Sequence, residues 1–74
     1  MALTGSMRSV DYAVNDVVIK TYPGMAPAAA AAIDAQSDPG ILGCIAGDDT
    51  VIVIMRSTEK AMALAEKLFS AIKK

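Results

Sequence analysis

Apolar residues recur along this chain with two different periods, one typical of strands and the other of helices. Residues 8–14 alternate between apolar and polar side chains, which predicts a half-buried strand. Residues 17–22 form a second run rich in β-branched residues. Asn15-Asp16 lies between the two runs and predicts a two-residue turn, because Asn and Asp tolerate positive φ. The two strands are therefore expected to pair antiparallel.

A second hairpin is predicted further along the chain. Two apolar runs, residues 41–45 and 51–55, flank Gly47-Asp48-Asp49. An alanine-rich stretch precedes this hairpin, and Pro27 is well placed in its first turn, where a missing N–H costs nothing. High helical propensity predicts a helix there, and residues 37–40, Ser-Asp-Pro-Gly, are expected to end it.

The last part of the chain has helical spacing. Ser57 or Thr58 is expected to cap a second helix, with Glu59 in its first turn, where a negative charge is favourable. The apolar positions of this helix form one stripe: Ala61, Leu64, Ala65, Leu68, Phe69 and Ile72.

The element order is therefore β-β-α-β-β-α, which predicts an α+β fold. We expect a two-layer sandwich, in which a four-stranded antiparallel sheet carries two helices on one face. This order resembles the pterin-dehydratase-like topology. Residues 51–55 are apolar on both sides, so the strand is either central or covered on its outer face by another molecule. We favour the second interpretation, because the chain offers no third layer.

Composition favours self-association. The chain has 74 residues, of which 54% are hydrophobic and only 4% aromatic, so its core is small and its apolar surface is large. Cys44 is the only cysteine and there is no histidine, which excludes an internal disulfide and disfavours a zinc site. Oligomerisation is the remaining way to stabilise so small a domain.

Charge and targeting patterns exclude other classes. The net charge of −1 gives no electrostatic footprint for nucleic acid. No apolar run approaches membrane-spanning length, and a signal-peptide core is lacking, so we expect a cytoplasmic protein without a membrane partner. Residues 1–7, Met-Ala-Leu-Thr-Gly-Ser-Met, are interpreted as a cloning leader outside the fold, and the chain is expected to be part of something longer.

The candidate chemistry is concentrated in two adjacent acids, Asp48 and Asp49, at the tip of the second hairpin. Neighbouring side chains at the end of a strand point in different directions. Two splayed carboxylates suit a cationic ligand held where subunits meet, and a planar guanidinium is the cation that carboxylates recognise best.

Residues 41–50, Ile-Leu-Gly-Cys-Ile-Ala-Gly-Asp-Asp-Thr, resemble the effector-domain signature of the bacterial arginine repressor family. Residues 18–24 and Asp34 resemble it at matching spacing. The resemblance implies that residues 8–74 form an effector-binding and oligomerisation domain. It implies trimers that stack into hexamers and bind L-arginine between them. A winged helix domain that contacts operator DNA would lie N-terminal and is absent from this chain.

The resemblance also implies the arginine-binding residues, which fall on Asp34, Ala46, Asp48 and Asp49. Two positions depart from the family pattern. The family usually has His or Gln where this chain has Pro27, which removes a polar side chain. It usually has Thr where this chain has Cys44, which replaces a hydroxyl by a weak S–H donor.

Two other functions compete with arginine sensing. A purely structural oligomerisation domain is the main alternative, and Pro27 and Cys44 are the features that favour it. An enzyme is disfavoured, because the chain has no histidine and no pairing of a nucleophile with a base. We therefore expect no catalytic residue, no cofactor and no metal.

Overall fold

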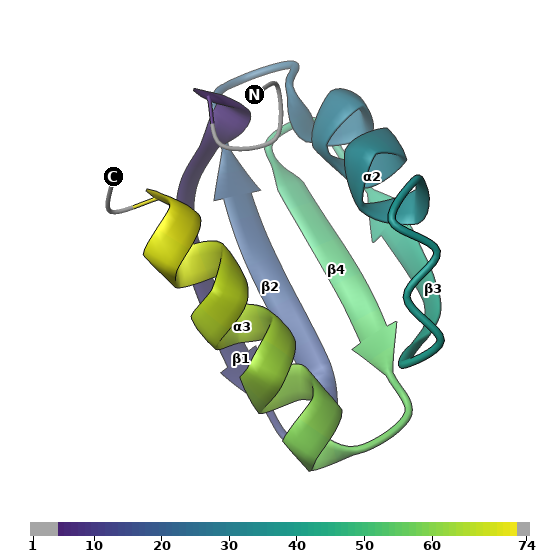
Figure 1. The fold of residues 1–74 in the computed structure, drawn as a ribbon. Coiled ribbons are helices and arrows are strands. Elements are labelled where there is room, and N and C mark those ends of the chain that lie inside the picture. Colours follow the sequence, from purple (N-terminus) through teal and green to yellow (C-terminus); the bar gives the residue numbers. More distant parts are fainter. Residues whose placement is uncertain (1–4, 73–74) are drawn as a thin grey trace.

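The computed structural model describes residues 5–72. Its strands and helices follow the predicted order: β1 (Met7–Ala13), β2 (Asp16–Thr21), α2 (Ala26–Asp34), β3 (Ile41–Ala46), β4 (Thr50–Met55) and α3 (Thr58–Ile72). The strands form one antiparallel sheet in the order β1-β2-β4-β3, and both helices lie on the same face (Figure 1). The predicted α+β sandwich is confirmed.

The core lies between the sheet and the helices. Side chains alternate along β2 and β4, so every second residue faces the helices. These positions are buried, as are the matching positions of the two helices: Val17, Ile19, Thr21, Val51, Val53, Met55, Ala26, Ala29, Ala30, Ile33, Ala61, Leu64, Ala65 and Leu68. The alanines of α2 are short, which lets this helix lie close to the sheet.

β4 is a central strand, because it pairs with β2 on one side and with β3 on the other. Of the two alternatives predicted for this strand, the central position is therefore confirmed, and coverage of its outer face by another molecule stays a prediction. The central position explains the apolar character of β4 on its helix face but leaves the other face open. On that open face Val18, Ile52 and Ile45 pair across three strands, and Ile52 and Ile45 are 38% and 69% exposed.

The first turn lies one residue earlier than predicted. Ala13 pairs with Asp16, so Val14 and Asn15 form the turn, and Val14 has a φ of 55°. Asn15 is held by β4: its carbonyl accepts a hydrogen bond from Met55 N at 2.8 Å, and its Nδ2 donates to Met55 O at 3.2 Å. These contacts fix Asn15 in the turn, and the neighbouring Val14 adopts a positive φ. Positive φ is uncommon for a β-branched residue.

The fold begins before residue 8. Met7 starts β1 and is only 4% exposed, and Ser6 is buried. The carbonyl of Ser6 accepts a hydrogen bond from Tyr22 N at 3.1 Å. The exclusion of residues 1–7 from the fold was therefore wrong for Ser6 and Met7, because both are buried and Met7 belongs to the hydrophobic core. Residues 1–4 of the predicted leader lie outside the described residues.

The predicted cap of the last helix is confirmed, since Ser57 Oγ accepts a hydrogen bond from Lys60 N at 3.1 Å. The predicted apolar stripe is buried as far as Leu68, but Phe69 is 50% exposed. Within residues 5–72, no helix combines the length and the apolar character needed to cross a membrane.

Candidate functional site

The acidic loop between β3 and β4 is a tight hairpin, as predicted. Gly47 N donates to the carbonyl of Thr50 at 2.8 Å, which leaves Asp48 and Asp49 as the two residues at the tip. Both acids are exposed. Residues 43–46 pair regularly with residues 51–54, after a register shift between Ile41 and Gly43, so that the hairpin places the two carboxylates at one end of the sheet.

Backbone hydrogen bonds hold this loop against two other elements. The carbonyl of Asp49 accepts from Thr21 N at 2.7 Å, at the end of β2. The carbonyl of Asp48 accepts from Ala26 N at 3.1 Å, in the first turn of α2. The end of β2 and the start of α2, which are close together in sequence, therefore both hold a loop that is far from them in sequence, and the loop backbone is fixed before any ligand arrives.

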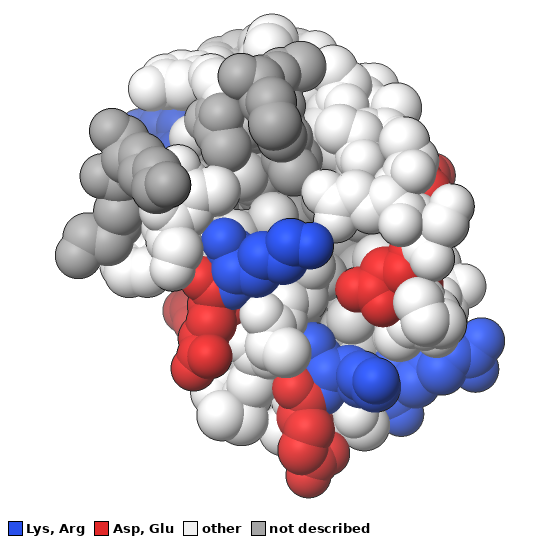
Figure 2. Space-filling view, in the orientation of Figure 1, with Lys and Arg blue, Asp and Glu red and all other residues white. Residues whose placement is uncertain are grey.

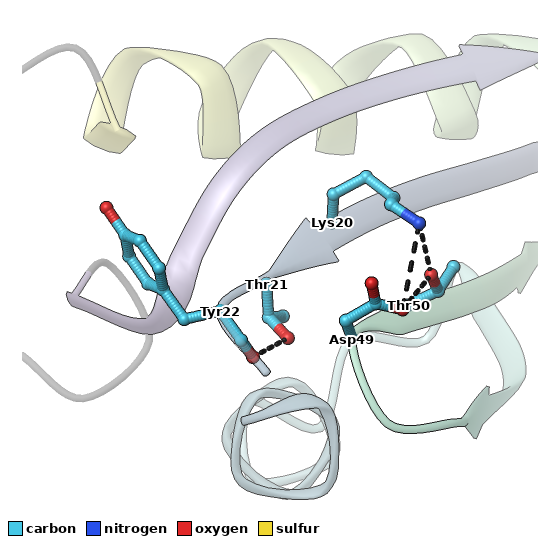
Figure 3. Close-up of polar contacts among 5 residues, drawn as sticks. All are labelled: Lys20, Thr21, Tyr22, Asp49 and Thr50. Atoms are coloured by element: carbon cyan, nitrogen blue, oxygen red, sulfur yellow. Dashed lines mark hydrogen bonds and ion pairs between the residues drawn. The ribbon is translucent and has the colours of Figure 1, made fainter. Parts of the chain in front are cut away.

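The carboxylate of Asp49 already has partners. Thr50 Oγ1 donates to Asp49 Oδ1 at 2.9 Å, and the ammonium of Lys20 lies 3.7 Å from the same oxygen. Lys20 reaches over from β2 and also donates to Thr50 Oγ1 at 2.7 Å (Figure 3). The hydrogen bond from Thr50 and then the charge of Lys20 lower the pKa of Asp49 below its ordinary value.

Asp48 has a different environment. Its carboxylate makes no hydrogen bond or ion pair with any described residue. Its backbone is held by α2, but its charge is left to solvent. The two neighbouring acids are therefore not equivalent: Asp49 is paired within the chain, whereas Asp48 has no partner among the described residues.

A second group of predicted residues lies where α2 runs beside the edge strand β3. Pro27 and Asp34 are seven residues apart on α2, which places them on one face of the helix, and both are exposed. Cys44 Sγ donates to Asp34 Oδ1 at 3.4 Å and lies 4.0 Å from the carbonyl of Ala30. Burial, and then the hydrogen bond and charge of Asp34, raise the pKa of the Cys44 thiol.

The structure thus sorts the six predicted residues into two groups. Asp34 and Cys44 form one pair, by direct contact. Asp48 and Asp49 form the other. Pro27 shares a helix face with Asp34 and follows Ala26, whose N–H donates to the carbonyl of Asp48, so Pro27 lies between the two groups. Ala46 is exposed at the end of β3, where it pairs with Val51 and leads into the acidic loop. Among the described residues, no side-chain hydrogen bond joins the two groups.

Lys20 is not among the predicted site residues, because a lysine at a strand position is by default solvated. The register supplies the signal: Lys20 pairs with Thr50, so its side chain stands on the same face as that hydroxyl and next to Asp49. The sequence predicts the contact between Lys20 and Asp49 only once β2 and β4 are known to be neighbouring strands.

Two further observations concern the surface charge and the residues that could bind a metal ion. On the face that carries the helices, acidic and basic side chains are interspersed rather than gathered by sign (Figure 2). Among residues 5–72, no three His, Cys, Asp or Glu side chains lie close enough together to hold a metal ion.

Comparison with known proteins places these features in a family. Residues 3–70 match the family described as "Arginine repressor, C-terminal domain". The chain is 60% identical over 60 residues to the arginine repressor of Acetivibrio thermocellus, a match that covers 81% of this chain and 39% of that protein. It is 48% identical over 71 residues to the arginine repressor of a Thermoanaerobacter species, which covers 96% of this chain and 47% of that protein.

The chain spans less than half the length of each of these two relatives. The family match, in contrast, covers nearly all of the chain and includes both groups of site residues. The resemblance first noted in residues 41–50 is therefore confirmed, and the chain belongs to the arginine repressor family, of which it matches the C-terminal domain.

Proposed function

We propose that this domain senses L-arginine where copies of the chain meet, within a transcriptional repressor of arginine metabolism that acts in the cytoplasm. The observation that carries the proposal is the environment of Asp48, an exposed carboxylate that has no partner among residues 5–72, on a loop whose backbone is fixed. A guanidinium is the natural counter-ion for such a group, because its planar donors match a carboxylate.

The fixed loop supports tight recognition. Carbonyls of Asp48 and Asp49 are held by α2 and β2, so little ordering of the backbone remains to be done when a ligand binds. Asp49 adds a second negative charge at the same tip, although Lys20 partly neutralises it. In this proposal Asp48 and Asp49 orient the guanidinium or the amino group of arginine, and backbone groups near Ala46 position the rest.

Asp34 and Cys44 give the proposed site a second polar end. The thiol donates to Asp34 Oδ1, which fixes the orientation of that carboxylate. Asp34 is exposed and can still accept a hydrogen bond from a ligand. Pro27 offers no polar side chain on the same helix face, so we expect weaker contacts there than in relatives with His or Gln.

Assembly into trimers or hexamers is the second part of the proposal. The open face of the sheet carries Val18, Ile52 and Ile45 side by side across three strands, and no described element covers them. A face of this kind is a candidate interface, because exposed apolar patches are costly in water. A ligand that binds the assembled state more tightly stabilises that state, and a DNA-binding domain outside this chain would then gain operator affinity.

A purely structural oligomerisation domain remains the second candidate. The thiol of Cys44 is turned to Asp34, and Pro27 has no donor, so two of the six positions contribute nothing obvious to a ligand. In that case the assembly would form without regard to arginine.

Calorimetry with arginine, lysine and citrulline tests the proposal, because citrulline keeps the shape of arginine but lacks its charge. We expect arginine to bind, to raise the melting temperature and to increase the mass seen by light scattering. Asp48→Asn should weaken arginine binding by about tenfold or more, since a charge-assisted hydrogen bond contributes about 1.5–3 kcal/mol.

Glu66→Gln, which removes a charge from the exposed side of α3, is the matched control and should leave arginine binding unchanged. Equal binding of citrulline and arginine would contradict recognition by carboxylates. An assembly that forms but does not respond to arginine would support the structural alternative.

A further inference from the structure

We infer that Lys20 is an internal counter-ion of Asp49 that competes with an incoming cation, and that this competition makes the acidic tip selective for guanidinium over ammonium ligands. The inference deepens the proposed function, because it concerns the same tip. It also makes statements about the chain without any amino-acid effector, and these can be tested separately.

The geometry of the contact carries the inference. Lys20 Nζ lies 3.7 Å from Asp49 Oδ1 and donates to Thr50 Oγ1 at 2.7 Å, while that hydroxyl donates to Asp49 Oδ1 at 2.9 Å. The ammonium, the hydroxyl and the carboxylate thus form a closed triangle at the tip (Figure 3). The ammonium occupies space that a cation approaching Oδ1 would otherwise use.

The contacts of this triangle can be exchanged for contacts with water or with a ligand. The side chains of Lys20 and Asp49 are 50% and 51% exposed, so water can replace either partner. Exposed ion pairs change an equilibrium constant by only about fivefold at most. A hollow of about 250 Å³, lined by Arg8, Ser9 and Lys20, gives the displaced ammonium room to move. The guanidinium of Arg8 lies 5.7 Å from the centre of the Tyr22 ring, and among the described residues the ion pair of Asp49 is with Lys20.

Selectivity follows from the shapes of the competing cations. Lys20 and Thr50 both approach Oδ1 of Asp49. A planar guanidinium, which has several donors, can therefore add a hydrogen bond to the other carboxylate oxygen, Oδ2. A free ammonium offers the same point charge as Lys20, but it must compete with a group that is tethered to the same sheet. Lys20 should therefore exclude ammonium ligands more strongly than guanidinium ligands.

The test uses methylguanidinium and methylammonium as probes and follows the Asp49 carboxyl carbon by NMR in the unliganded chain. Lys20→Met should lower the half-saturating concentration of both probes, by up to about fivefold for methylammonium and by less for methylguanidinium. Lys20→Arg should weaken methylguanidinium binding, because it places a competing guanidinium on Asp49. Lys67→Met, an exposed lysine on α3, is the control for net charge and should change neither value.

Equal gains for the two probes in Lys20→Met would overturn the inference of selectivity, and weaker binding of either probe would show that Lys20 assists the ligand instead of competing with it. Circular dichroism checks that each variant is folded. Because the probes report on Asp49 directly, a chain that passes this test and yet binds no arginine in the calorimeter would refute the proposed function alone.

Discussion

The carbonyl of Asp48 accepts a hydrogen bond from the N–H of Ala26 at 3.1 Å, so the acidic loop closes the start of α2. The residue before this helix, Met25, provides no side-chain cap. The first N–H groups of a helix need acceptors from outside the helix, and the loop carbonyl of Asp48 is the acceptor for one of these N–H groups. The position of the acids and the position of α2 are therefore coupled, and a change in one should be felt by the other.

That coupling makes the packing of α2 important for the site. Ile33 is the only large side chain among the buried residues of α2, since the others are alanines, and it is 1% exposed. Ile33→Ala should lower the free energy of unfolding by about 2–5 kcal/mol, and Ile33→Val by about 0.5–1.5 kcal/mol. Urea denaturation followed by circular dichroism measures both values.

Met62→Ala is the matched control, because Met62 is 39% exposed on α3. It should change the free energy of unfolding by no more than about 0.5 kcal/mol. If Ile33→Ala were as mild as this control, α2 would not be held by its single large core residue.

The element order and the core could be predicted from the sequence because both depend on local periodicity. The predicted helical stripe is buried as far as Leu68 for this reason. The half-buried strand predicted at residues 8–14 is instead mostly exposed, with Tyr12 37% and Val14 70% exposed. The first turn was misplaced, because the contact that sets it joins Asn15 to Met55, forty residues away. The central place of β4 was only one of two alternatives for the same reason: strand order is a property of the whole sheet.

The candidate site divides in a similar way. The acids Asp48 and Asp49 were predictable, since turn chemistry and family resemblance both marked them. The difference between the two was not, because it depends on Lys20, a residue that comes from another strand. The contact between Cys44 and Asp34 was also hidden, since it joins an edge strand to a helix.

The neutralisation of Asp49 predicts a pH dependence. Its pKa is lowered in the folded chain, first by the hydrogen bond from Thr50 and then by Lys20. A lowered pKa stabilises the fold above the ordinary value of 3.8, and this contribution is lost as the pH falls through the lowered value. Thr50→Val should raise the pKa of Asp49 towards its ordinary value, which a titration of the carboxyl carbon shift by NMR measures. An unchanged or lower pKa in the variant would contradict the role given to Thr50.

The thiol of Cys44 should react slowly at neutral pH, because burial and the carboxylate of Asp34 raise its pKa. Asp34→Asn removes the negative charge and should speed alkylation by iodoacetamide, although burial still keeps the pKa above its ordinary value. The rate is followed by mass spectrometry across a range of pH. Glu66→Gln controls for net charge and should leave the rate unchanged, whereas a slower reaction of Asp34→Asn would contradict the contact.

The open face of the sheet supplies the last prediction, which concerns assembly. Ile52 lies in the middle of the apolar row, between Val18 and Ile45, and is 38% exposed. Ile52→Lys places a charge at the centre of the proposed interface and should raise the dissociation constant of the assembly by about thirtyfold or more, because central apolar contacts dominate interfaces. Light scattering measures the mass, and thermal melting checks the fold of the single chain. Met62→Lys, on the helix side of the molecule, is the control and should keep the mass of the wild type. If Ile52→Lys assembled as well as this control, the open face would not be the interface, and copies of the chain would have to meet elsewhere.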